Sequence, residues 1–126
     1  MTMTADLTAP DTLITAPELP DDDLDTPCAI VDLGRLERNI ATEQARADAA
    51  GVALRPHAKT HKSARVAALQ QAAGARGLTV GTLGEAEVFA DAGFDDLFLA
   101  YTVWASASKA GRVRDLHERL RLRVGV

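Results

Sequence analysis

The chain has 126 residues, which is enough for one domain with a single buried core. Its 47% hydrophobic and 25% charged residues are typical of a soluble globular protein and exclude a disordered or collagen-like chain. No apolar run approaches the roughly 18 residues of a membrane span, and the net charge of −4 gives no reason to expect nucleic acid as a partner. The single cysteine, Cys28, cannot form an internal disulfide, and the N-terminus has no secretory pattern, so we expect a cytoplasmic protein.

The first 26 residues differ in charge from the rest of the chain. They carry seven acidic residues and no Lys or Arg, and Pro10, Pro17 and Pro20 interrupt them. This composition predicts a flexible, acidic N-terminal arm over residues 1–26. The ordered domain is expected to begin at Pro27 and to cover residues 27–126.

From Pro27 onward, short apolar runs alternate with stretches of helical periodicity. The runs that predict strands are residues 28–31, 52–54, 78–81, 97–101 and 122–126. The first three predicted helices end at a glycine: Gly51, Gly74 and Gly93. Ser63 is expected to cap the second helix, and the T-x-x-E pattern of Thr82 and Glu85 predicts a capping box at the start of the third. A fourth helix carries Val113, Leu116 and Leu120 on one face.

Strands that alternate with helices of this length predict right-handed βαβ crossovers and a parallel sheet. Four such units and a fifth strand make about half of a (β/α)₈ barrel. A doubly wound open sheet of five strands is the alternative, although the first connection lacks the G-x-G-x-x-G phosphate turn. In either fold one sheet edge collects Asp32 and residues 57–63, 81–85 and 101–104.

Residues 55–63, with the sequence R-P-H-A-K-T-H-K-S, hold the densest group of chemically active side chains. In an extended segment Arg55, His57 and Lys59 point to the same side. A lysine crowded by other cations is favoured in its neutral form, and a neutral amine is what Schiff-base chemistry requires.

Several of these motifs together resemble a known family. They are T-P-C-A-I-V-D at 26–32, L-E-R-N-I at 36–40, the R-P-H-A-K-T-H-K-S stretch, and G-T-L-G-E-A-E at 81–87. In these motifs the chain resembles the D-threonine aldolase and D-serine dehydratase-like family of fold-type III pyridoxal phosphate (PLP) enzymes. The resemblance implies an α/β fold, a partial parallel (β/α) barrel of the alanine racemase type, of which residues 27–126 are the N-terminal half.

The resemblance also implies a function. It points to a PLP-dependent lyase, an aldolase or dehydratase, acting on D-amino acids that carry a β-hydroxyl. Lys59 matches the Schiff-base and catalytic lysine, and His57 is expected to line the cofactor pocket. A divalent metal, Mn²⁺ or Zn²⁺, would be bound in the full-length enzyme through residues absent here, and a homodimer is one form open to it. The 126-residue chain alone is expected to be incomplete and inactive.

Three other interpretations remain open: a truncated non-catalytic remnant, an amino-acid racemase, and a PLP-carrier protein of the same fold. For His57 and His61, two ligands are too few for a typical metal site, so we expect none. We interpret Asp32 as a helix N-cap and Cys28 as a buried core residue. The arginines between 112 and 123 are interpreted as solvated surface residues, although Arg121 and Arg123 are unusual in a buried parallel strand.

Overall fold

The computed structural model describes residues 27–125, so the predicted acidic arm over residues 1–26 lies outside the described part of the chain. The chain divides into two compact units between Asn39 and Ile40. Within residues 27–125, every helix is too short or too polar to cross a membrane.

The described part of the first unit leads into helix α1 (Leu33–Ala49). Asp32 caps this helix as predicted, because its Oδ1 accepts a hydrogen bond of 2.8 Å from the Arg35 backbone N–H. The predicted strand over residues 28–31 is wrong: these residues have no regular structure, and Ile30 is 59% exposed. Cys28 is exposed rather than buried. An apolar run becomes a strand only when a neighbouring strand takes up its backbone hydrogen bonds.

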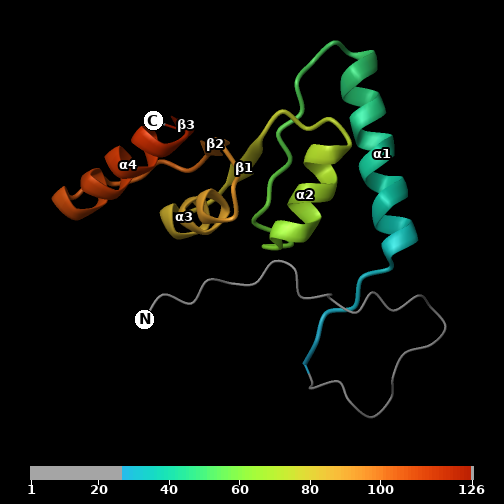
Figure 1. The fold of residues 1–126 in the computed structure, drawn as a ribbon, viewed down its shortest axis with the longest axis horizontal. Coiled ribbons are helices and arrows are strands. Elements are labelled where there is room, and N and C mark those ends of the chain that lie inside the picture. The colour runs from blue at the N-terminus through green and yellow to red at the C-terminus, as the bar shows by residue number, and fades with distance from the viewer. Residues whose placement is uncertain (1–26, 126) are drawn as a thin grey trace. The chain divides into compact units, whose positions relative to one another are not determined.

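The second unit contains a parallel sheet of three strands in the order β1–β2–β3 (Figure 1). The strands are β1 (Leu78–Val80), β2 (Asp96–Leu99) and β3 (Arg121–Val124), which confirms the last three predicted strands. The predicted strand over residues 52–54 is displaced toward the C-terminus. Residues 54–58 lie parallel to β1 through an isolated bridge between His57 and Thr79. The Ala58 N–H donates to the Thr79 carbonyl and the Thr79 N–H to the Pro56 carbonyl, both at 2.8 Å.

Three further helices complete the second unit: α2 (Ala64–Ala72), α3 (Leu83–Asp91) and α4 (Ala107–Arg119). Ser63 Oγ accepts from the Val66 N–H and Thr82 Oγ1 from the Glu85 N–H, so both predicted N-caps are confirmed. In Figure 1, α3 and α4 lie together beside the strands, and they contact each other.

The two faces of this sheet have opposite character. The face that α3 and α4 cover is apolar, because the side chains of Leu78, Val80, Leu97 and Leu99 are fully buried there. Side chains alternate across a strand, and directly paired residues of parallel strands share a face. The register therefore puts another set on the opposite face: Arg55, His57, Thr79, Asp96, Phe98, Arg121 and Arg123. In a closed parallel barrel this second face is the interior.

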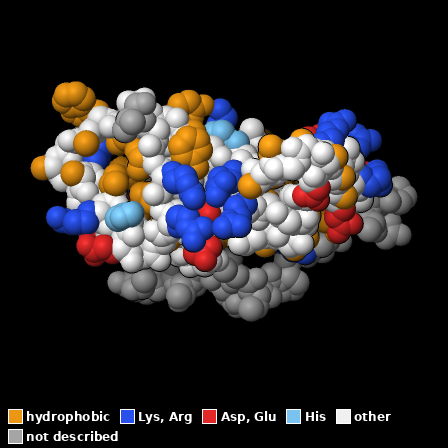
Figure 2. Space-filling model, turned by 90° about the horizontal axis from the view of Figure 1, so that it is seen from above, with side chains coloured by type: hydrophobic (Ala, Val, Ile, Leu, Met, Phe, Trp, Pro, Cys, Tyr) orange, Lys and Arg blue, Asp and Glu red, His pale blue; other side chains and the backbone are white. Residues whose placement is uncertain are grey.

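Three arginines on this second face converge on Asp96, whose side chain is only 5% exposed. Its carboxylate accepts from Arg55 at 3.0 and 3.2 Å, from Arg123 at 2.6 Å and from Arg121 at 3.4 Å. Basic side chains gathered around acidic ones are visible near the centre of Figure 2. This shared carboxylate explains why arginines alternate along β3, and it corrects the interpretation that Arg121 and Arg123 are simply solvated.

Candidate functional site

Three segments reach the carboxyl edge of the sheet side by side. Lys59 follows the segment paired with β1, Gly81 follows β1, and Tyr101 comes two residues after β2. Because parallel strands end at the same edge, residues more than 40 positions apart meet there. This edge is where parallel α/β proteins bind their ligands.

Lys59 carries an exposed amine at this edge. Its Nζ lies 2.6 Å from Tyr101 Oη, and 5.2 Å from the centroid of the Tyr101 ring. The phenol hydroxyl therefore offers the amine a hydrogen bond. Arg55 was expected to be one of the cations around Lys59. Its guanidinium group instead forms an ion pair with Asp96.

His57 stands next to this pair, with its ring centroid 6.2 Å from that of Tyr101. The backbone N–H of Lys59 donates to His57 Nδ1 at 3.3 Å. A neutral His57 that accepts at Nδ1 must carry its proton on Nε2. Nε2 is buried and has no hydrogen-bond partner among the described residues. This orphaned donor would be satisfied by a ligand atom that accepts a hydrogen bond.

Glu85 differs from its predicted role. The capping box would have its carboxylate accept from the Thr82 N–H. Instead Oε2 accepts from the Gly81 N–H at 2.8 Å, and Oε1 lies 3.3 Å from Lys62 Nζ. The Gly81 hydrogen bond is the main cause that holds the pKa of the Glu85 carboxyl below its ordinary value, and Lys62 adds to the effect against the opposing effect of burial. Glu85 therefore places an ionised carboxylate at the same edge as Lys59.

His61, two residues after Lys59, is partly buried, and its Nε2 is buried. Its Nδ1 accepts from the Ser63 N–H at 3.1 Å. Burial lowers the pKa of His61, against hydrogen bonds that favour the charged form. Among residues 27–125 no three His, Cys, Asp or Glu side chains are grouped as a metal site would need.

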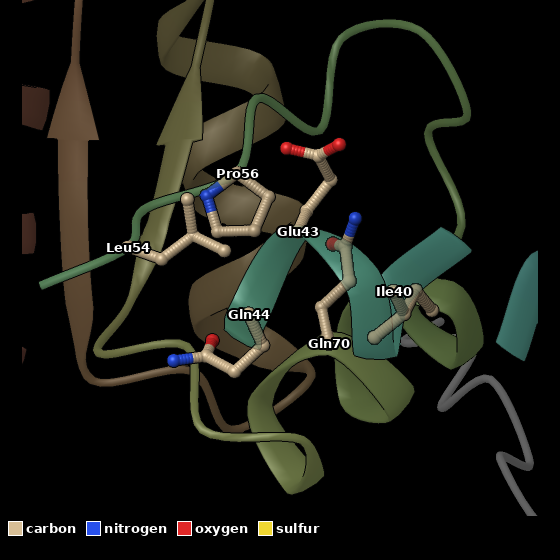
Figure 3. Close-up of a pocket in the computed structure, with 6 residues that line it drawn as sticks. All are labelled: Ile40, Glu43, Gln44, Leu54, Pro56 and Gln70. Carbon is tan, nitrogen blue, oxygen red and sulfur yellow. The ribbon is translucent and has the colours of Figure 1, made fainter. Parts of the chain in front are cut away.

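Among the pockets of the second unit, one lies at the carboxyl edge of the sheet and another next to residues 54–56. One of about 310 Å³ opens at the carboxyl edge, between the start of α3 and the residues after β2, and includes Gly81, Thr82 and Trp104. The other, of about 230 Å³, is shown in Figure 3, where Ile40, Glu43 and Gln44 of α1 surround it with Leu54, Pro56 and Gln70. Leu54 and Pro56 alternate with Arg55 and His57, so this second pocket lies behind the strand segment, away from the Lys59 amine.

Sequence reasoning placed Lys59, His57 and Tyr101 at one edge, and the structure brings them together there. Asp96 was given no role. The sequence does contain a signal for one: Asp96 begins an apolar strand, and the next strand carries alternating arginines that could pair with it. Sequence reasoning also gave Glu85 a purely local role.

The fold and this edge define an α/β protein of the alanine racemase type. Residues 31–124 match the family described as alanine racemase, N-terminal domain. The chain belongs to this family, and the predicted partial barrel fold is confirmed.

The chain is also similar to individual enzymes of known activity. The chain is 59% identical over 80 residues to D-threo-3-hydroxyaspartate dehydratase of Delftia sp. strain HT23, covering 64% of this chain and 21% of the relative. It is 42% identical over 87 residues to D-threonine aldolase of Arthrobacter sp., covering 69% and 23%. The crystal structure of D-threonine aldolase from Filomicrobium marinum superposes with a TM-score of 0.78 at 39% identity, covering 82% of this chain and 28% of that one. The chain thus spans about a fifth to a quarter of the length of these curated relatives.

Proposed function

We propose that residues 27–126 are the first, lysine-bearing half of the barrel domain of a PLP-dependent lyase that acts on D-amino acids with a β-hydroxyl. The relatives named as a dehydratase and an aldolase support this class of reaction and substrate. The observation that carries the proposal is the exposed Lys59 amine, held at the carboxyl edge of a parallel sheet by Tyr101.

The residues at this edge fit PLP at its aldehyde end. Lys59 would hold the cofactor covalently, because an exposed primary amine is the group that condenses with an aldehyde. His57 would line the cofactor, and its orphaned Nε2–H suits an acceptor atom of a bound ligand. When bound, PLP supplies an electron sink for the pair released from the bond broken at the substrate Cα.

The chain's own residues contribute charge and position. Once freed by a substrate amine, Lys59 would accept or return a proton at the substrate Cα. Ionised Glu85 would keep Lys62 in place next to this edge, since their side-chain atoms lie 3.3 Å apart.

Labelling with PLP tests the assignment of Lys59. The chain has three lysines, Lys59, Lys62 and Lys109, so each can be followed separately. After incubation with PLP, borohydride reduction and peptide mapping, we expect the label on Lys59. Lys59→Arg should abolish it and the matched control Lys62→Arg should leave it. Labelling spread evenly over the three lysines, or its absence, would overturn the assignment and favour a non-catalytic remnant.

The reaction itself is tested by product analysis. A longer protein that contains this chain together with the rest of the barrel domain is incubated with D-threonine and with D-threo-3-hydroxyaspartate, with and without Mn²⁺ or Zn²⁺. Aldehyde and glycine indicate an aldolase, while a keto acid and ammonia indicate a dehydratase. Inversion at Cα without cleavage would contradict the lyase assignment and support a racemase.

A further inference from the structure

Tyr101 reaches across a neighbouring strand to meet Lys59. It comes two residues after β2, while Lys59 follows the segment on the far side of β1. Gly81, directly after β1, lies between them. A Cβ at Gly81 would lie 3.3 Å from Tyr101 Cε2 and 3.4 Å from its Cδ2. The missing side chain at Gly81 therefore leaves the space in which the tyrosine ring lies.

The contact between Tyr101 and Lys59 suits an amine that changes its protonation state. A phenol hydroxyl can accept a hydrogen bond from an ammonium group and can donate one to a neutral amine. The 2.6 Å contact can therefore persist in both states, with the hydroxyl accepting from the ammonium group or donating to the lone pair of the neutral amine.

We propose that Tyr101 is a positioning residue for Lys59: its hydroxyl holds the amine at the carboxyl edge, beside His57, through both protonation states. This inference rests on the proposed function, because the amine is held for condensation with PLP. The hydroxyl group of Tyr101 positions the amine, and the ring, packed next to Gly81, supports the hydroxyl.

A purely structural role makes a different prediction for Tyr101→Phe. This variant keeps the ring over Gly81 and next to His57 and removes only the hydroxyl. If the ring only packs against Gly81, the reactivity of Lys59 should be the same with phenylalanine as with tyrosine at position 101. Trp104→Phe is a matched aromatic control, because Trp104 is on the same edge and 85% exposed.

The first measurement needs no cofactor. The intact chain is acetylated with limiting reagent, and the modification of Lys59 is compared with that of Lys109 by peptide mass spectrometry. In Tyr101→Phe we expect this ratio to rise about threefold, since the amine loses a hydrogen bond that occupies it. Trp104→Phe should leave the ratio as in the unmodified sequence. An unchanged or lower ratio in Tyr101→Phe would overturn the inference.

The second measurement follows modification of Lys59 by PLP. Here we expect the opposite direction, a fall of about fivefold in the equilibrium constant, because a freed lysine must be ordered again on binding. A loss of packing around Tyr101 alone would not raise the acetylation of Lys59 and at the same time lower its modification by PLP. Unchanged PLP modification in Tyr101→Phe would overturn the positioning role.

The two readouts separate this inference from the proposed function. If PLP shows no preference for Lys59 in the unsubstituted chain, the proposed function fails, and with it the positioning role toward PLP. The acetylation ratio then still reports whether the hydroxyl restrains the amine. If PLP prefers Lys59 equally in both proteins, the proposed function stands and the inference about Tyr101 fails. Circular dichroism of each variant verifies that the fold is retained.

Discussion

Arg55 and Asp96 are 41 positions apart and form a two-pronged ion pair, with Nε and Nη2 at 3.2 and 3.0 Å from the two carboxylate oxygens. The pair joins the segment before Lys59 to the first residue of β2, across β1. It thereby anchors the strand segment whose continuation carries the candidate lysine. Arg121 and Arg123 of β3 bind the same carboxylate, so one aspartate of β2 connects the segment before Lys59 with β3.

Replacing this shared acceptor should destabilise the protein. We expect Asp96→Asn to lower the free energy of unfolding by about 2 kcal/mol, less than for a fully buried pair because Arg121 and Arg123 are 59% and 46% exposed. The amide leaves three guanidinium groups close together without a carboxylate. Urea denaturation monitored by circular dichroism measures the change.

Asp91→Asn is the matched control for Asp96→Asn. Asp91 also pairs with an arginine, Arg119, but its side chain is 69% exposed. Its replacement should change the free energy of unfolding by no more than about 0.5 kcal/mol. Equal effects of the two substitutions would contradict the anchoring role of Asp96.

Acid should destabilise the fold in two stages. Burial lowers the pKa of His61 below its ordinary value of 6.5, so the folded state resists protonation and stability falls as the pH drops through and below 6.5. Burial alone would raise the pKa of Asp96, but Arg55 and Arg123 outweigh it and lower the pKa, and that of Glu85 is lowered as well. Their stabilisation is complete above their ordinary values of 3.8 and 4.5 and is lost as the pH falls through the lowered values.

Urea midpoints measured from pH 8 down to pH 3 test both stages. His61→Asn keeps an acceptor for the Ser63 N–H and should remove the upper stage only. Glu85→Gln keeps an acceptor for the Gly81 N–H and should reduce the lower stage only. A pH profile of either variant parallel to that of the unsubstituted chain would refute its assignment.

Two glycine substitutions should act in opposite directions. A Cβ at Gly77 would lie 2.3 Å from the backbone carbonyl oxygen of Asp96, so Gly77→Ala must push β1 and β2 apart and should cost at least about 2 kcal/mol. Gly111 lies inside α4 with nothing within 4 Å of its Cβ position. Gly111→Ala should therefore stabilise by about 0.5–1 kcal/mol. Thermal unfolding of the two variants measures both effects, and a tolerated alanine at position 77 would mean that the strand spacing is looser than described.

Local signals in the sequence were enough for most of the second unit. The hydroxyl groups of Ser63 and Thr82 cap the helices they were predicted to cap, because a cap depends on backbone groups only three residues away. The last three apolar runs form strands, since each follows or precedes a helix that covers its apolar side. The motif around Lys59 indicated the family through residue types alone, and the family match bears that out.

Tertiary structure decided what depends on distant partners. Residues 28–31 have the composition of a strand but have no regular structure, since composition alone does not provide the strand partner that a strand needs. Glu85 binds the Gly81 N–H in place of its expected helix-start partner. Above all, the meeting of Lys59 with Tyr101 follows from the register of parallel strands, which pairing across the sheet sets and which no short stretch of sequence contains.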